Sequence, residues 1–451
     1  MIDVQHKCKR VGDYSKLVDY RRDLYGCFGN GKDVLMNLVD AMLTGPGARS
    51  FVELSLSPAF TRRWPSVYEV FDDAQINRQA LQRLFLRTVP ARSPGTRQIL
   101  AADASPIVRA ESQTARDRTY VHVPNAPKGA KPVAPGWQFA TVVALPEKPS
   151  SRTTILDNRR IQSDQTASQV VAQQLTELSP QLPDDAIVAL DGGFGNALFV
   201  SGTRDVAIGK LMRTAKNRTF YRAKPEHVCK AGRPRLDGYP FAIRDPTTHG
   251  PSDEHWGGTD EKGDCIEADC WRNLHFRKCR QASLTLIRIA RANGADTKRN
   301  PRVIWLIWHG TNMPQLEQIP QIYALRYCIE HSYRFDKQNL LWTKPRLRTP
   351  EKFETWTNIV AAVHNHITLA HQYRQDFRMP WANPKAEATP EQIRRGLVGI
   401  IAQLGTPARP TQPRGKAPGR QLGAVIKKSK RFKTIKKCKT QDEKVCRQQA
   451  I

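Results

Sequence analysis

Two short apolar runs, each closed by an aspartate, organise this sequence: QILAAD at residues 98–103 and AIVALD at residues 186–191. Each run has the length and composition of a buried strand, and turn-forming residues follow each aspartate. Sites in α/β sheets form where parallel strands end. If the two strands are neighbours, Asp103 and Asp191 face one small volume; the alternative for each is a turn-initiating or helix-capping acid.

Two carboxylates held in one small volume repel each other unless a divalent cation neutralises them. Hard oxygen ligands without Cys or His nearby in the sequence favour Mg²⁺ or Mn²⁺ over Zn²⁺. The pair therefore indicates a candidate magnesium site.

The segments around these runs predict an α/β layered domain. Ser105 and Pro106 are expected to stop the first strand. Further strands are predicted at residues 137–145, 205–211 and 303–308, and helices at 163–178, 318–341, 350–374 and 390–404.

Composition divides the chain into five regions. They are a helical N-terminal region (1–95), the first part of the core (96–215), a β-rich insertion (216–300), the second part of the core (301–375), and a C-terminal helix with a basic tail (376–451). Apolar periodicity at residues 14–27, 33–43 and 77–89 supports the first assignment, which fits a DNA-binding domain or a helical cap. Beyond about residue 406 the chain is rich in Pro, Gly and Lys, which predicts a disordered tail that binds polyanions or serves only for solubility.

The net charge indicates an anionic partner. Among 451 residues, 71 Lys and Arg outnumber 42 Asp and Glu, which gives +29. A long polyanion is favoured over an anionic membrane, because no basic amphipathic helix with an aromatic face is present. The polar N-terminus and the lack of a long apolar run predict a cytoplasmic protein.

Cysteine and histidine usage adds little. An odd number of cysteines, nine, scattered over the chain indicates reduced thiols. A zinc site from His227, Cys229, Cys265 and Cys270 is a weak alternative, because structural zinc sites show tighter ligand pairs. The spacing of His364, His366 and His371 does not suit a metal, so they are predicted to be structural or surface residues.

A third acid is expected on a helix. Tyr323, Arg326, Glu330 and Lys337 fall on one helical face, with Arg334 beside it. Such a stripe suits a nucleic-acid site in which the acid completes a metal site and the bases hold phosphates. The alternative is a solvated face with ion pairs from Glu330 to Arg326 and Arg334.

A basic run enters the insertion with interleaved aromatic residues. It comprises Lys210, Arg213, Lys216, Arg218 and Arg222, with Phe220 and Tyr221. We interpret it as a contact region for the DNA backbone; the alternative is a solvated surface.

The spacing of the stripe, Tyr-x2-Arg-x3-Glu-x6-Lys, resembles the YREK signature of DDE transposases from cut-and-paste bacterial insertion sequences. The ADAS around Asp103 and the LDGGFGN around Asp191 resemble that family's first two catalytic acids. The separation of 330 − 191 = 139 residues suits the branch with a β-rich insertion before the last acid. The resemblance covers about residues 95–375.

The resemblance implies an RNase H-like mixed sheet flanked by helices. It also implies that Asp103, Asp191 and Glu330 are catalytic and hold two Mg²⁺ ions, with Mn²⁺ able to substitute. The implied DNA contacts are Tyr323, Arg326 and Lys337, with Arg334 beside them and Lys210, Arg213, Lys216 and Arg218 from the basic run. The partner would be double-stranded DNA, at transposon ends and at the target, bound by a homodimer in the bacterial nucleoid.

Three other functions share these features. The alternatives are a catalytically inactive DNA-binding relative, a hydrolytic nuclease or resolvase, and a nucleic-acid-binding protein whose acids are surface groups. Replacing Glu330 by Gln separates the last of these, because a pure binder would not change.

Overall fold

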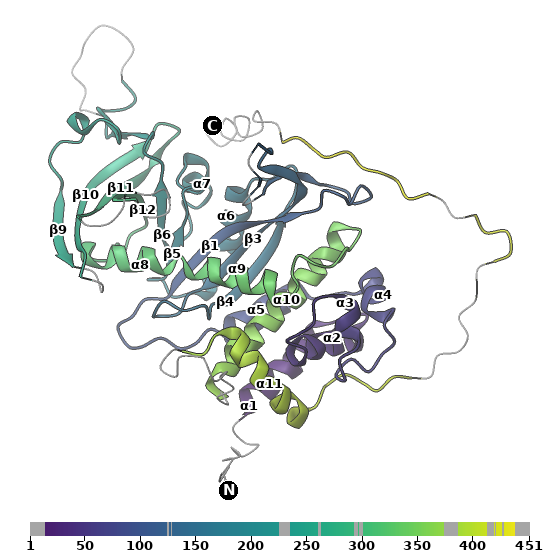
Figure 1. Cartoon of the computed structure of the whole chain (residues 1–451). Coiled ribbons are helices and arrows are strands. Elements are labelled where there is room, and N and C mark those ends of the chain that lie inside the picture. The colour runs from purple at the N-terminus through teal and green to yellow at the C-terminus, as the bar shows by residue number, and fades with distance from the viewer. Residues whose placement is uncertain are drawn as a thin grey trace.

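The structure is a computed structural model of the whole chain (Figure 1). It describes residues 14–123, 126–127, 129–224, 235–259, 263–292, 296, 301–373, 387–412, 419, 421–425 and 428–437. Within these residues no helix is long and apolar enough to cross a membrane.

One mixed sheet of twelve strands runs through the described part of the chain, in the order β2-β3-β1-β5-β6-β12-β11-β10-β7-β8, with β4 beside β3 and β9 beside β10. The strands of the first half are β1 (Ile99–Val108), β2 (Thr119–His122), β3 (Val133–Ala144), β4 (Thr154–Ile161), β5 (Ile187–Leu190) and β6 (Gly209–Thr214). Those of the second half are β7 (Thr219–Arg222), β8 (Pro240–Ala242), β9 (Glu254–Thr259), β10 (Cys265–Phe276), β11 (Cys279–Arg291) and β12 (Val303–His309). β5 is parallel to both β1 and β6, whereas the remaining pairings are antiparallel.

The first strand is longer than predicted, because β1 continues through Pro106 to Val108. Odd-numbered residues of β1 turn their main-chain groups toward β3, as the bond from Arg109 N–H to Pro135 O (2.8 Å) shows. Pro106 therefore faces the β5 side, where β5 has already ended at Leu190. A proline is tolerated there because no partner strand needs its missing N–H.

Eleven α-helices lie in the described part. They are α1 (Ser15–Cys27), α2 (Lys32–Thr44), α3 (Phe51–Ser55), α4 (Ser66–Asp73), α5 (Arg78–Arg87), α6 (Ala167–Leu178), α7 (Ala197–Gly202), α8 (Ile319–Leu325), α9 (Cys328–Gln338), α10 (Pro350–Ala370) and α11 (Pro390–Leu404). Local signals fix several of their starts: the side chains of Asn77, Thr166 and Thr389 each accept a hydrogen bond from the first turn. The N-terminal part is helical, as predicted.

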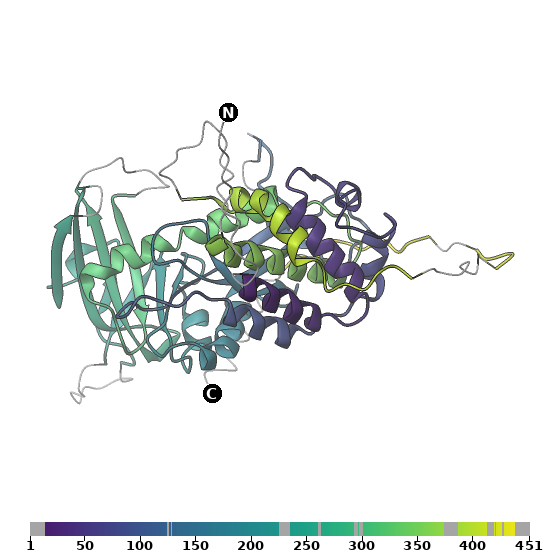
Figure 2. The same cartoon turned by 90° about the horizontal axis from the view of Figure 1, so that it is seen from below.

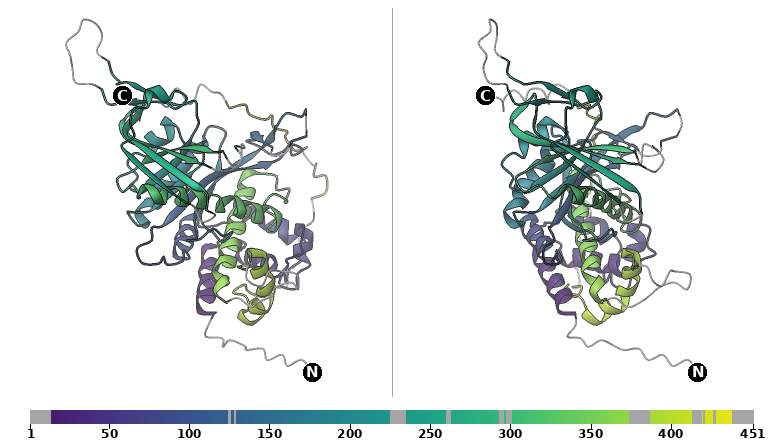
Figure 3. Two further views of the ribbon diagram at one scale, coloured as in Figure 1. Left: turned by 60° about the vertical axis from the view of Figure 1, so that its left-hand side comes forward. Right: turned by 90° about the vertical axis from the view of Figure 1, so that its left-hand side faces the viewer.

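The N-terminal helices pack against the C-terminal ones. α2 contacts both α10 and α11, and α5 contacts β4. Figures 2 and 3 show this helical bundle at one end of the molecule and the long strands β10 and β11 at the other. Residues 14–87 thus share one apolar core with helices that lie more than 260 residues later in the chain.

The helix predicted over residues 318–341 is interrupted. α8 ends at Leu325 and α9 begins at Cys328, and the two are joined by a tight turn in which Glu330 N–H donates to Tyr327 O (3.1 Å). Glu330 therefore lies in the first turn of α9, whereas Tyr323 lies on the preceding helix.

The tail also differs from the expectation. Residues 428–437 lie extended beside the edge of the sheet, with a β-bridge between Ile435 and Thr119. The predicted disorder of the tail is therefore wrong for this segment.

Candidate active site

Strand register places the two aspartates side by side. In the parallel pair of β1 and β5, Ala102 lies opposite Leu190, so Asp103 and Asp191 follow at adjacent positions. Because side chains alternate along a strand, Asp103 shares its sheet face with Ala101, which belongs to the core that also contains residues of α9 and α10. The predicted meeting of the two acids agrees with this geometry.

The loop after β5 is shaped around Asp191. Its Oδ1 accepts a hydrogen bond from Gly193 N–H (2.9 Å). Asn196 then donates from its amide to Gly193 O (2.7 Å) and caps α7 by accepting from Phe199 N–H (3.0 Å). Gly195 packs so closely on β6 that a Cβ there would lie 2.2 Å from Arg213 O. The loop therefore holds Asp191 against β6 and leaves little room for movement.

The environment of Asp103 disfavours its negative charge. Burial, and then the neighbouring Asp191 carboxylate, raises the pKa of Asp103 to about 7, against the hydrogen bond from Ala104 N–H and the nearby Arg326. Glu330 makes a smaller contribution to the same increase, so both other predicted acids raise the pKa of Asp103. A carboxyl group in this state is stabilised in its charged form by a bound cation.

Helix α9 is fixed on β1 at the position of the first aspartate. Tyr333 donates its hydroxyl hydrogen to the main-chain oxygen of Asp103 (2.9 Å). Lys337 lies one turn further, with its ammonium 5.8 Å from the centre of the Tyr333 ring. Tyr333 is not among the predicted site residues, although its position three residues after Glu330 places it on a neighbouring part of the helix surface.

The Glu330 carboxylate is ion-paired with Arg326, another residue of the helical stripe. Arg326 donates to Glu330 Oε1 at 2.8 Å, which is one of the two ion pairs considered for a solvated face. Within the described residues no group of three or more His, Cys, Asp or Glu side chains is arranged so that it could hold a metal ion. The donor chemistry of Asp103 and Asp191 fits a divalent cation, and Arg326 occupies Oε1 of Glu330 in this arrangement.

The family model described as DDE superfamily endonuclease matches residues 23–273. The chain belongs to the DDE superfamily of endonucleases. Both aspartates of this DDE endonuclease lie inside the matched range, and the mixed sheet flanked by helices is consistent with the RNase H-like fold of such enzymes. The match ends before Glu330, so assignment to the YREK branch stays a prediction. No curated protein significantly matches the chain.

A basic pocket adjoins Glu330 of the DDE endonuclease. It has a volume of about 420 Å³ and contains Arg213, Tyr323 and Arg326, three of the predicted DNA contacts. Arg291 at the end of β11 and Arg302 before β12 also line it. The Tyr323 hydroxyl is buried without a hydrogen-bond partner in the described part. Sequence spacing could not have revealed the two added arginines, because β-sheet pairing brings them here.

The other predicted DNA contacts are dispersed. Lys210 is wrong as a contact, because its side chain is buried and its ammonium donates to Thr203 O (3.2 Å) and Val206 O (2.8 Å). Burial lowers the pKa of Lys210 to about 8. Lys216 and Arg218 are exposed after β6, and Arg334 is exposed on α9.

The remaining cysteine and histidine candidates form no metal site among the described residues. Cys265 is exposed and Cys270 buried on β10, whereas His227 and Cys229 lie outside the described residues. His364 is structural: its Nδ1 lies 2.7 Å from Asp336 Oδ1 and its Nε2 3.0 Å from Thr153 O. It thereby connects α10 to α9 and to the residue that precedes β4.

Proposed function

We propose that this DDE endonuclease is a DNA transposase that cleaves the ends of its element and joins the freed 3′-hydroxyl groups to target DNA. One observation carries the proposal: Asp103 and Asp191 lie side by side on the sheet face covered by α9, the helix that bears Glu330. The family itself supports a nuclease-type enzyme, and strand joining is the step that we add.

The acids are proposed to hold divalent cations, of which Mg²⁺ is the physiological candidate and Mn²⁺ a substitute. Cations in such sites activate the attacking oxygen and neutralise the leaving oxygen in a displacement at phosphorus. In the first step a water oxygen bonds to phosphorus and the bond to the 3′-oxygen breaks, which leaves a 3′-hydroxyl and a 5′-phosphate. In the second, that hydroxyl attacks a target phosphate and displaces its 3′-oxygen.

The basic side chains would orient the DNA. The guanidinium groups of Arg213 and Arg326 and the unpartnered Tyr323 hydroxyl line one pocket, which suits the oxygens of a backbone phosphate. A phosphate bound to Arg326 would compete with Glu330 for that guanidinium. DNA binding would thereby free Glu330 to join the aspartates.

The proposal includes a homodimer that synapses two element ends on double-stranded DNA, in the bacterial cytoplasm. The net charge of +29 supports a DNA partner and gives no information on the number of subunits.

The first experiment compares wild type with Glu330→Gln on supercoiled DNA that carries the element's own ends, with Mg²⁺ and with EDTA. We expect metal-dependent nicking and strand joining by wild type, and at least a thousandfold less by Glu330→Gln with unchanged binding. Binding without cleavage in any metal would favour an inactive DNA-binding relative. Cleavage without joining would favour a hydrolytic nuclease, and cleavage by Glu330→Gln would exclude Glu330 as the third acid. Glu267→Gln, the same substitution at an exposed residue of β10, is the matched control.

A further inference from the structure

Residues 428–437, which we call the tail strand, lie beside the loop that precedes β2 and beside the first residue of β2. Phe432 N–H donates to Gln113 O (2.8 Å) and Ile435 N–H donates to Arg118 O (2.7 Å). Ile435 also forms a parallel bridge with Thr119, the first residue of β2. Main-chain groups at the edge of a sheet are a template for such a strand, and they bind it irrespective of its side chains.

A buried guanidinium makes this docking specific. The Arg118 side chain is buried and donates to the main-chain oxygens of Ala115 (3.1 Å) and Arg109 (3.1 Å). Its remaining Nη2 donates to Phe432 O of the tail strand (2.9 Å). Without the tail strand Nη2 of Arg118 would lose its acceptor, whereas Nε and Nη1 would keep theirs.

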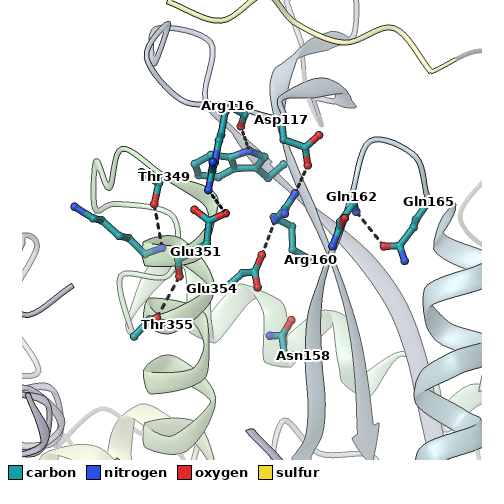
Figure 4. A network of polar contacts seen from close by, with 12 residues as sticks. Arg116, Asp117, Asn158, Arg160, Gln162, Gln165, Thr349, Glu351, Glu354 and Thr355 are labelled. Carbon is teal, nitrogen blue, oxygen red and sulfur yellow. Dashed lines mark hydrogen bonds and ion pairs between the residues drawn. The ribbon is translucent and has the colours of Figure 1, made fainter. Parts of the chain in front are cut away.

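The loop that receives the tail strand is fixed to the body of the protein. Arg160 of β4 is ion-paired with both Asp117 and Glu354, and Arg116 is ion-paired with Glu351 (2.7 Å) (Figure 4). Both glutamates belong to α10. The docking surface is therefore part of the rigid structure that also carries the acids.

The docked segment turns its charges outward. Phe432 and Thr434 are partly buried, whereas Arg431, Lys433 and Lys436 are exposed. The segment contains six Lys and Arg and no acid. Among the described residues, no ion pair involves Lys430, Arg431, Lys433 or Lys436. A row of cations at fixed spacing without acidic partners is complementary to a phosphate backbone.

The tail strand leads toward the active site. The Lys437 ammonium donates to Gln165 O (2.6 Å), just before α6. Three residues later, Ser168 Oγ accepts from the Asn196 amide (3.3 Å), and that same amide binds Gly193 O in the loop of Asp191. The end of the tail strand is thus close to the loop of the second acid.

We propose that the tail strand is a built-in DNA-binding surface, an extended segment docked beside the start of β2, that binds the backbone of duplex DNA as it leaves the active site. Its cations act at fixed positions, in contrast to a disordered tail, whose charges act diffusely. The proposed DNA chemistry gives this surface its role beside the acids, but the docking and the binding can be tested independently of cleavage.

The experiment uses full-length protein in EDTA and a 40-base-pair duplex of arbitrary sequence, with affinity measured by fluorescence anisotropy from 50 to 200 mM salt. The first variant replaces Lys430, Arg431, Lys433 and Lys436 with Gln and keeps both main-chain donors. A matched variant with the same loss of charge replaces Arg414, Lys416, Arg420 and Lys439. A third, Phe432→Pro with Ile435→Pro, removes both donors and keeps every charge.

In the first variant we expect the slope of log affinity against log salt to become shallower by 3 to 4, at about 0.9 for each phosphate that the protein no longer neutralises. Over this range of salt, wild type would lose about a hundredfold more affinity than that variant. The matched variant should change the slope by less than 1. In the double-proline variant the slope should become shallower by at least half of the change seen in the first variant. This variant should also lose the hydrogen-exchange protection of residues 428–437.

Three results would overturn the proposal. Equal slopes for the two charge variants would mean that the tail acts only as a diffuse charge. A wild-type slope in the first variant would mean that the tail strand does not touch DNA. A double-proline variant that loses the protection of residues 428–437 but keeps the wild-type slope would mean that DNA binding does not need the docked tail strand. A wild type that binds as expected and never cleaves would contradict the transposase proposal and leave this one intact.

Discussion

The two strand-borne aspartates and the helix-borne glutamate are held in place by different means. Asp103 and Asp191 are set by the main-chain register of β1 and β5, which no surface change alters. Glu330 follows a break between two helices and is oriented by an ion pair with Arg326. The comparison shows that two of the candidate acids are positioned by the main chain, whereas the third is positioned by a side-chain contact.

The largest effect is expected at the pair of aspartates. Asp103→Asn should lower metal-dependent cleavage at least a thousandfold and stabilise the metal-free protein at alkaline pH. The folded-state pKa of about 7 lies above the ordinary 3.8, so folding becomes less favourable as the pH rises between these values. The gap corresponds to at most about 4 kcal/mol. Denaturant unfolding in EDTA at pH 4 and pH 8 measures it.

The exposed Asp164→Asn is the matched control and should change neither quantity. Mg²⁺ should raise the melting temperature of wild type and not that of Asp103→Asn. Equal stability of Asp103→Asn and wild type at pH 8 would mean that neither burial nor Asp191 disfavours the charge of Asp103.

The next effect concerns the support of α9. Burial lowers the pKa of His364, but Asp336 and the bond to Thr153 O outweigh it and raise the pKa above 6.5. The charged pair therefore stabilises the fold fully below pH 6.5, and this stabilisation is lost as the pH rises through the folded-state pKa. His364→Gln should cost about 3 kcal/mol at pH 5.5, because a buried carboxylate loses its partner, and less at pH 9.

Denaturant unfolding at both pH values checks this, with the exposed His122→Gln as control. Asp336→Asn should remove the same pH dependence. A cost for His364→Gln that is the same at both pH values would show that the imidazole is neutral in the folded protein.

A smaller effect on cleavage is expected when Glu330 loses its arginine partner. Arg326→Gln removes the partner of Glu330, so the Mg²⁺ concentration for half-maximal cleavage should fall. Removing a cation that binds phosphate should make the salt slope of DNA binding shallower by about 1, and overall cleavage should decrease about tenfold. Mg²⁺ titrations of cleavage at saturating DNA measure the change in Mg²⁺ midpoint separately from the change in DNA binding. An unchanged Mg²⁺ midpoint would contradict competition between Glu330 and phosphate for Arg326.

The smallest effect distinguishes two neighbours on β6. Lys210→Met should leave the salt slope of DNA binding unchanged, because the ammonium is buried on main-chain oxygens. Arg213→Gln, which changes a residue of the basic pocket, should reduce the slope by about 1. Anisotropy titrations of both variants provide the test, and a shallower slope for Lys210→Met would return this lysine to the DNA surface.

The sequence by itself determined the local elements and the identity of the candidate acids. Apolar runs define buried strands, and the strand-ending positions of Asp103 and Asp191 predict their meeting, since both depend on a few consecutive residues. The helical stripe around Glu330 was readable only in part: Glu330 and Lys337 share α9, whereas the break before Cys328 leaves Tyr323 on α8.

Only the tertiary structure decided which distant residues became neighbours. Pro106 stays within β1 because β5 has ended beside it, and sheet pairing buries Lys210 and brings Arg291 and Arg302 to the basic pocket. The docking of the tail strand needs an edge strand more than 300 residues away. Such contacts depend on how elements meet in space, and no local periodicity encodes that.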